Sequence, residues 1–261
     1  MSGGIRKFYR IDYNGSPLHV IEEDGRWRLL EGDLFGHHEA GAEIPRDGHR
    51  LLAPIVPSKM VCIGLNYKDH AAEVKKPLPT EPLMFIKPST AVIGPGAAIE
   101  LPTGVGRVDH EAEAGVVIGR RARHVREADA SSYVLGLVCF NDVTARELQQ
   151  KGLQYTHVKG FDTFAAIGPC IASGIDYHAA DGIAVEGWVN GARRQSSSTK
   201  QLVFSIDYLI AYVSRVMTLL PGDIIATGTP PGIGPLAAGD SVTIKVAGVG
   251  ELTNPVKEER P

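Results

Sequence analysis

One acidic segment constrains the fold of this chain more than any other stretch. Residues 108–119 read VDHEAEAGVVIG, and the second half is apolar and rich in β-branched side chains, which favours an extended strand. Side chains alternate between the two faces of a strand, so Glu111 and Glu113 are expected to point the same way, one pleat apart. The opposite face is predicted to be core: Ala112, Ala114, Val116 and Ile118.

Two carboxylates on one face of a mostly apolar strand repel each other and resist burial unless something compensates their charge. A bound hard cation would compensate the charge of Glu111 and Glu113, and so would water at an exposed edge of a sheet. The alternation of side chains does not distinguish a metal site from a solvated edge, so the strand alone leaves both interpretations open.

A second candidate site lies on a short predicted helix. Residues 60–64 form an apolar strand, and the helical pattern that follows begins with Asp69 as its expected N-cap and ends before Pro77. His70 and Glu73 stand three residues apart and therefore share a helix face. A carboxylate beside an imidazole raises its basicity and fixes its tautomer, as a general base requires. A solvated pair on the helix surface is the alternative.

A central apolar segment leads directly to a third carboxylate. Residues 133–140 are mostly apolar and are predicted to form a buried central strand. Asp142 follows at the strand end, where sheets often present functional groups, although a turn residue or helix cap would also explain it. Residues 144–150 are predicted to be helical, and residues 159–169 a loop with glycine and proline that begins with Lys159.

Composition limits the class of protein and its partners. The 261 residues, 43% hydrophobic and 22% charged, are typical of a soluble globular protein, and a net charge of −3 gives no reason to expect nucleic acid or an anionic membrane as a partner. No apolar run is long enough to cross a membrane, and the first residues contain no apolar stretch, so no secretory signal is expected. Three widely spaced cysteines are predicted to be buried thiols of a cytoplasmic protein.

Strand and turn signals divide the chain into two predicted domains. Residues 4–50 alternate short β segments with turns, and a proline-containing linker follows over residues 51–57. The expected division is a small N-terminal β domain over residues 1–55 and a catalytic domain over residues 56–261. Residues 204–220 show the clearest helical spacing of apolar side chains, and that stripe is predicted to face the core.

Taken together, the motifs of the second domain resemble the fumarylacetoacetate hydrolase family over residues 58–257. In chain order they are GLNY (64–67), DHxxE (69–73), FIKP (85–88), HEAE (110–113), NDVTAR (141–146), KGFD (159–162), GP (168–169), RQ (194–195) and GDxIxTGTPxG (222–232). The resemblance implies a mixed α+β, β-rich fold in which a β-roll of mixed sheets carries short helices. It also implies a small N-terminal β module, as in the bacterial members that degrade aromatic compounds, and a homodimer.

In this family, paired glutamates and a downstream aspartate bind one divalent cation per subunit. The resemblance therefore implies that Glu111, Glu113 and Asp142 are metal ligands, and the sequence does not depart from the family pattern at these positions. All three supply oxygen, which suits Mg²⁺ or Mn²⁺ better than Zn²⁺. The family match thus favours the metal site over the solvated edge.

The resemblance also assigns the remaining roles. It implies that His70, held by Glu73, is the general base, and that Lys159 is a catalytic residue that stabilises negative charge. The residues expected to bind the substrate are Arg146, Gln149 and Thr229.

The activity that the resemblance implies first is metal-dependent hydrolysis of a C–C bond in an acylpyruvate-type 2-oxo acid, through an enolate. The same enolate would serve a 2-hydroxyhepta-2,4-diene-1,7-dioate isomerase of aromatic catabolism. It would also serve a decarboxylase of 5-oxopent-3-ene-1,2,5-tricarboxylate or oxaloacetate, so these activities remain alternatives. A homologue that binds a dicarboxylate without turnover is a third. In each case the expected partner is a small molecule rather than nucleic acid or a membrane.

Overall fold

A large mixed sheet runs through the whole protein. The structure, a computed structural model, describes residues 4–259, so the outermost residues of both predicted domains lie outside it. In spatial order the strands of this sheet are β4 (His38–Ile44), β3 (Arg26–Gly32), β2 (Ser16–Glu23), β1 (Arg6–Tyr13), β14 (Ala165–Ser173), β12 (Val134–Asp142), β11 (Ala112–Ile118), β17 (Ile224–Ala226), β6 (Met60–Gly64) and β7 (Leu83–Lys87). Two further short strands pair off this path: β5 (Arg50–Leu51) with β1, and β8 (Val92–Ile93) with β14.

Two smaller sheets and a few short helices complete the fold. One sheet is ordered β16 (Ala192–Ser198), β15 (Ala184–Val189), β19 (Ser241–Val246), β20 (Gly250–Glu258), β9 (Ile99–Leu101), and the other β13 (Thr144–Ala145), β10 (Val108–His110), β18 (Gly234–Pro235). The helices are α1 (Lys68–Glu73), α2 (Arg146–Gln150), α3 (Tyr155–Lys159) and α4 (Ile206–Val216), with 3-10 turns η1 (Ser89–Ala91), η2 (Glu127–Tyr133) and η3 (Thr199–Gln201). The β-rich mixed fold predicted from the sequence is therefore confirmed.

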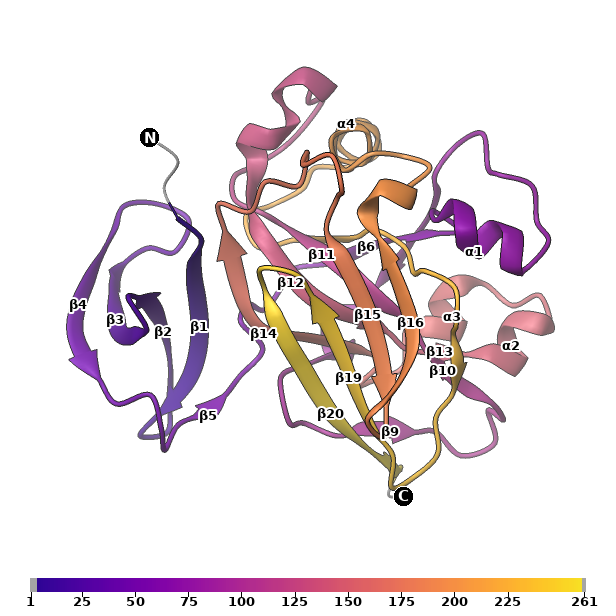
Figure 1. Cartoon of the computed structure of the whole chain (residues 1–261), viewed down its shortest axis with the longest axis horizontal. Coiled ribbons are helices and arrows are strands. Elements are labelled where there is room, and N and C mark those ends of the chain that lie inside the picture. The colour runs from indigo at the N-terminus through magenta and orange to yellow at the C-terminus, as the bar shows by residue number, and fades with distance from the viewer. Residues whose placement is uncertain (1–3, 260–261) are drawn as a thin grey trace.

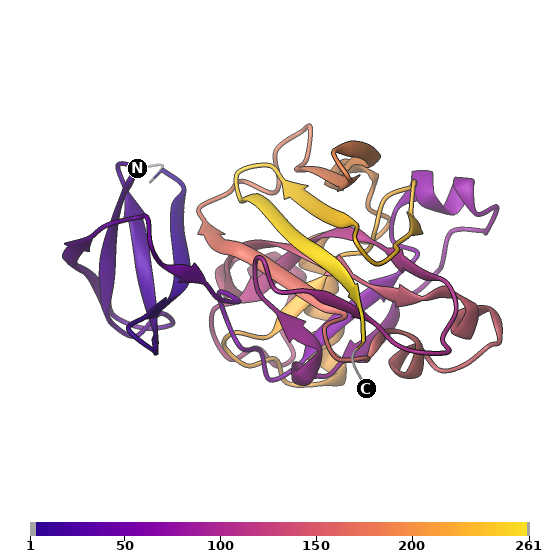
Figure 2. The same ribbon diagram turned by 90° about the horizontal axis from the view of Figure 1, so that it is seen from below.

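The N-terminal strands β1 to β4 form an antiparallel meander at one end of the molecule (Figures 1 and 2). Its first two turns contain Asn14-Gly15 and Asp24-Gly25, and all four residues have positive φ, which is the backbone that a two-residue hairpin turn requires. β1 also pairs antiparallel with β14, with Arg6 opposite Ser173. The meander is thus hydrogen-bonded into the same sheet as the rest of the chain.

The larger of two core clusters lies between the large sheet and the five-stranded sheet, where β11, β12 and β14 contact β15, β19 and β20. The predicted core face of the acidic segment, from Ala112 to Ile118, is completely buried there, and all three cysteines are buried free thiols. The short helices α1, α2 and α3 gather on the side of the body that faces away from the N-terminal meander (Figure 1). No helix within residues 4–259 has the length and apolar character needed to cross a membrane.

Several local predictions were wrong in detail. The acidic segment is not one strand: it breaks at Glu111 because β10 pairs with β13 and β18, whereas β11 pairs with β12 and β17. Asp69 is not the N-cap of α1, which is Tyr67; the Asp69 carboxylate instead accepts hydrogen bonds from the His70 amide and the Ser197 hydroxyl.

Two other segments differ from their predicted structure. The segment 159–169 is a loop only over residues 160–164. Lys159 ends α3, and β14 begins at Ala165, where pairing with β12 overrides the local glycine and proline signal. The predicted helix 204–220 is shorter, because Ser205 caps α4 by accepting a hydrogen bond from the Tyr208 amide, and the backbone is already extended at Met217.

Gly136 in β12 allows a close approach of β14, and this contact can be tested. A Cβ atom at Gly136 would lie 2.4 Å from the carbonyl oxygen of Ala172, which strand pairing holds in place. We expect Gly136→Ala to lower the free energy of unfolding by about 1–3 kcal/mol, as measured by urea denaturation followed by circular dichroism. At Gly64 the nearest contact of a Cβ would be an ordinary 3.6 Å. Gly64→Ala is therefore the control, and equal losses in the two variants would contradict the steric argument.

Candidate active site

The predicted site residues come together around a single cavity of about 280 Å³. It is bordered by α1, α2, α3 and the adjoining ends of β6, β11 and β12. All of the predicted residues except Glu73 line it: His70, Glu111, Glu113, Asp142, Arg146, Gln149, Lys159 and Thr229. Glu73 lies directly behind His70. Residues separated by up to 159 positions in the sequence thus face one space.

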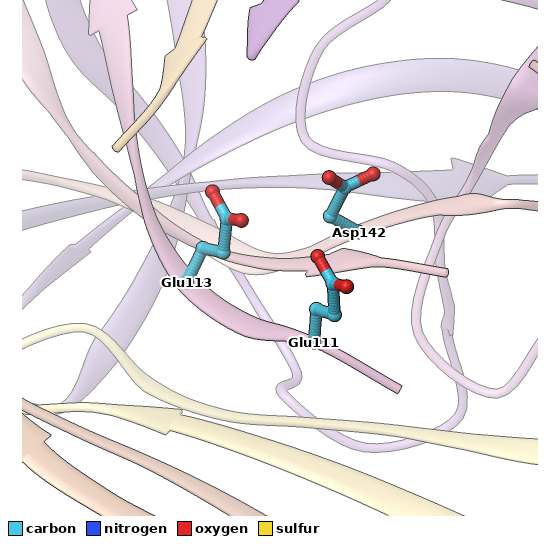
Figure 3. A group of neighbouring side chains, drawn as sticks. All are labelled: Glu111, Glu113 and Asp142. Carbon is cyan, nitrogen blue, oxygen red and sulfur yellow. The ribbon is translucent and has the colours of Figure 1, made fainter. Parts of the chain in front are cut away.

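Three carboxylates converge at the floor of this cavity. Glu111 lies between β10 and β11, Glu113 lies on β11, and Asp142 ends β12, which pairs antiparallel with β11 (Figure 3). One oxygen atom from each lies within 4.8 Å of the others. Glu111 is 6% exposed, and Glu113 and Asp142 are each 1% exposed. A solvated strand edge is therefore excluded.

Buried cations hold two of the three carboxylates. Lys159 Nζ donates to Asp142 Oδ2 at 2.5 Å and to Glu111 Oε2 at 2.7 Å. Lys87 Nζ donates to Asp142 Oδ1 at 2.5 Å, and Arg146 forms an ion pair with Glu111 Oε1. Burial would raise the pKa of Glu111, but Lys159 and Arg146 lower it to about 2.

Glu113 has no such compensation. Its Oε2 accepts a hydrogen bond from the Gly228 amide at 2.8 Å, and no ion pair to it exists within residues 4–259. Burial, and then the nearby Asp142 carboxylate, raise the pKa of Glu113 well above its usual range. A buried carboxylate without a cation, next to two others that also present oxygen, matches the ligands that a hard divalent ion prefers. The donor set therefore fits Mg²⁺ or Mn²⁺.

The His70–Glu73 pair forms as the spacing predicts. His70 Nδ1 lies 2.9 Å from Glu73 Oε2, and the Gly232 amide donates to Glu73 Oε1 at 3.0 Å. Because Nδ1 faces a carboxylate, it carries the proton, and Nε2 keeps its lone pair. His70 is 8% exposed and lines the cavity, so the solvated helix surface is excluded as an interpretation of this pair.

Lys159 is placed differently from the expectation. It was expected at the start of a polar loop, but it ends helix α3 and is only 3% exposed. The Tyr155 ring of α3 stacks on Phe85 of β7, with the ring centroids 5.0 Å apart, which holds this short helix against the sheet. The charge of Lys159 is tolerated inside the protein because two carboxylates accept its hydrogen bonds.

Two charged residues of the site escaped prediction. Lys87 is fully buried and also donates to the Phe164 carbonyl oxygen at 2.6 Å. Its sequence signals are its place at the end of an apolar strand and within the FIKP motif, neither of which indicates its role. Asp109 is fully buried between Arg107 Nε at 2.6 Å and Arg146 Nε at 2.8 Å, and it thereby orients Arg146.

Gln195 joins the loop that contains Thr229 to the strand of the glutamates. Its Oε1 accepts from His110 Nδ1 and from the Ala112 amide, both at 2.9 Å. Its Nε2 donates to Thr229 Oγ1 at 2.7 Å and to the Pro230 carbonyl oxygen at 2.8 Å. The Thr229 hydroxyl donates its own proton to the Ala112 carbonyl oxygen at 2.9 Å, so it has none left to donate to a ligand.

Comparisons with known proteins agree with this fold. Residues 59–257 match the family described as fumarylacetoacetate (FAA) hydrolase, C-terminal, and residues 6–54 match the family described as Rv2993c-like, N-terminal. The fold is that of a class of enzymes that includes hydrolases and isomerases. The chain belongs to the fumarylacetoacetate hydrolase family, in the form that begins with an Rv2993c-like segment.

Individual relatives are similar to this chain over most of its length, and one of them is named for an activity. A protein of Archaeoglobus fulgidus is 50% identical over 86% of this chain and 88% of its own length. The mitochondrial oxaloacetate tautomerase fahd2 of Xenopus laevis is 40% identical over 82% of this chain and 70% of its own.

Two solved structures with the same fold are named for other activities, an isomerase and a hydrolase. A 2-hydroxyhepta-2,4-diene-1,7-dioate isomerase from Mycobacterium marinum has a TM-score of 0.89 at 36% identity, covering 98% of this chain and 99% of its own. Maleylpyruvate hydrolase from Sphingobium sp. SYK-6, solved with manganese(II) and pyruvate, has a TM-score of 0.81 at 28% identity, covering 97% and 100%.

Because no cation of the described residues pairs with the Glu113 carboxylate, we expect its replacement to stabilise the protein when metal is absent. Glu113→Gln keeps an acceptor for the Gly228 amide and removes a buried acid whose pKa is raised. We expect the variant to melt higher than the wild type in EDTA, by roughly 2–4 °C for about 1 kcal/mol. A carboxyl with a raised pKa destabilises the fold more as pH rises, so this gain should be larger at pH 8 than at pH 5.

If Glu113 is one of three ligands of a bound cation, the same variant should also lose most of any rise in melting temperature that Mn²⁺ gives the wild type. Differential scanning calorimetry with EDTA and with Mn²⁺ measures both effects. A variant that melts lower in EDTA, yet keeps the full stabilisation by Mn²⁺, would contradict both the uncompensated burial of the Glu113 carboxylate and its role as a metal ligand.

Proposed function

We propose that the protein is a divalent-metal-dependent enzyme that acts on 2-oxo acids, with hydrolysis of a C–C bond in an acylpyruvate-type substrate as its reaction. The observation that carries this proposal is the position of the His70–Glu73 pair on the same cavity as the buried carboxylates Glu111, Glu113 and Asp142. A base at His70 and a cation at these carboxylates would then act on the same small molecule.

The metal site is part of the proposal. Glu111, Glu113 and Asp142 would hold one Mg²⁺ or Mn²⁺ per subunit, and such an ion acts as a Lewis acid that polarises a carbonyl oxygen. The solved maleylpyruvate hydrolase with manganese(II) and pyruvate supports both the ion and the 2-oxo acid.

Positive groups of the chain would stabilise the charge that develops on the substrate. Lys159 has three N–H groups, of which two are used by Glu111 and Asp142, so one remains for an enolate oxygen. Arg146 Nη1 donates to Gln149 Oε1 at 2.5 Å, which leaves the Gln149 amide N–H groups free to bind a substrate oxygen. Thr229 would contribute its position in the wall rather than its hydroxyl proton.

His70 would begin the reaction. Its Nε2 takes a proton from water, and the hydroxide attacks the carbonyl carbon distal to the 2-oxo acid. The bond between that carbon and its neighbour breaks, which gives a carboxylic acid and the enolate of pyruvate; protonation of the enolate carbon completes the products. Glu73 stabilises the imidazolium that forms in the first step.

The same residues could instead move a proton between carbon atoms or assist loss of CO₂. The resemblance to the M. marinum isomerase and to the Xenopus oxaloacetate tautomerase supports isomerisation as the second candidate activity. Two sequence-based expectations remain proposals: a cytoplasmic homodimer, and a division into an N-terminal domain (1–55) and a catalytic domain (56–261). The two family matches, over 6–54 and 59–257, support that division.

An ultraviolet assay with Mg²⁺ or Mn²⁺ tests the activity. An acylpyruvate, oxaloacetate and a hydroxymuconate-type dienoate would be compared, and we expect turnover of the acylpyruvate that EDTA abolishes and added metal restores. Turnover of the dienoate alone would establish the second candidate instead. Metal-dependent binding of oxalate, measured by calorimetry, without turnover of any of the three would contradict an enzymatic role.

Mutation of His70 separates the base from the metal site. We expect His70→Ala to reduce kcat by at least about 100-fold, the usual contribution of a general base, while calorimetry gives an unchanged Kd for Mn²⁺. Glu73→Gln should reduce kcat less, because the imidazole remains but its tautomer is no longer fixed. Undiminished turnover of His70→Ala would refute its role as base.

A further inference from the structure

We propose that Lys76 selects substrates that carry a second carboxylate at the end remote from the 2-oxo acid. This inference rests on the proposed function and names the class of substrate: an extended dicarboxylate rather than a short or apolar-ended 2-oxo acid. Lys76 lines the same cavity as the buried carboxylates, but it is exposed, so it lies at the mouth while they lie at the floor.

Lys76 is the cation of the cavity that remains available. Among the residues that line the cavity, Arg146 is paired with Asp109 and Glu111, and Lys159 is paired with two of the carboxylates of the floor. Lys76 forms no ion pair within the part of the chain that the structure describes. A substrate carboxylate at the mouth would therefore meet an ammonium group that no carboxylate of the protein neutralises.

The backbone at Lys76 is held in place by the end of helix α1. Lys75 has a left-handed φ of 52°, and the Lys76 amide donates to the Ala71 carbonyl oxygen at 3.0 Å, which closes the helix with a Schellman-type turn. Pro77 follows and restricts the backbone of Lys76 to extended conformations. Both constraints fix the backbone of Lys76, just beyond the end of α1, relative to His70, which lies on α1.

The kinds of group that line the cavity suit the successive parts of such a substrate. The pyruvate end would lie at the carboxylate floor, and the distal carbonyl would face His70. The chain beyond that carbonyl would run along apolar side chains, namely Leu65, Val74 and Ile233, towards Lys76 at the mouth. A two-carbon acyl group would end before it reaches the mouth.

Two matched substrates and two neighbouring lysines test this inference. The substrates are acylpyruvates of equal length that end in a carboxylate or in a methyl group. We expect Lys76→Gln to raise KM for the carboxylate substrate about 5-fold, the scale of an exposed ion pair, and to leave its kcat and the KM of the methyl substrate unchanged. Lys76→Arg should restore the KM. Lys75→Gln removes the same charge one residue away and should change neither KM.

The preference for the carboxylate substrate should also shrink at high ionic strength in the wild type. An unchanged ratio of the two KM values in Lys76→Gln would overturn the inference while leaving the proposed function intact. An equal effect of Lys75→Gln would overturn it too, because the effect would then come from net charge alone.

If the wild type turns over neither substrate, the proposed hydrolysis fails, but Lys76 is still tested by binding. Calorimetry on the Mn²⁺-loaded protein would compare 2-oxoadipate with 2-oxohexanoate, which differ at the remote end. Weaker binding of 2-oxoadipate alone in Lys76→Gln supports the inference, and equal affinities of wild type and variant for 2-oxoadipate refute it.

Discussion

The burial of three carboxylates within a few ångströms of one another sets the conditions that the rest of the site meets. Like charges in a water-excluded space are tolerated only where cations and hydrogen-bond donors surround them. Lys87 and Lys159 approach the two oxygens of Asp142, and the Gly228 amide approaches Glu113. These donors come from β7, α3 and the loop after β17, so elements distant in the sequence converge on one point.

The cations that neutralise the buried carboxylates also make the cavity better suited to bind an anion. The two lysines offset two of the three negative charges at the floor, and a divalent ion would reverse the sign of the remainder. The proposed 2-oxo acid, which is negatively charged, would then enter a site of opposite charge instead of meeting carboxylates. Arg146 adds to this field, but Asp109 and Glu111 hold its guanidinium in one orientation.

Local geometry explains which parts of the site could be predicted from the sequence. Glu111 and Glu113 follow the alternation of a strand, and His70 and Glu73 follow the spacing of a helix, so each pair is determined by neighbours in the chain. The contacts of Gln195 could not be found in this way, because its partners lie up to 85 residues away, and the RQ motif that contains it indicates the family but not these contacts.

The errors in predicted structure have a similar origin. A five-residue helix such as α3 is too short to show helical periodicity, so the segment that begins with Lys159 was assigned to a loop. Asp69 was expected to cap α1, but its carboxylate is shared with Ser197, which is 128 residues away. Pairing with distant strands likewise divided the acidic segment at Glu111.

The pairing of β1 with β14 gives the N-terminal meander a structural role independent of catalysis. β14 pairs with β12 on one side, and on the other side it pairs with β8 at Ala165–Ala166 and with β1 at Ile171–Ser173. Without β1, the amide and carbonyl groups of that last stretch would form an open sheet edge, the kind of surface that recruits strands from other molecules. The meander therefore covers this edge of β14, and the large sheet ends at β4 instead.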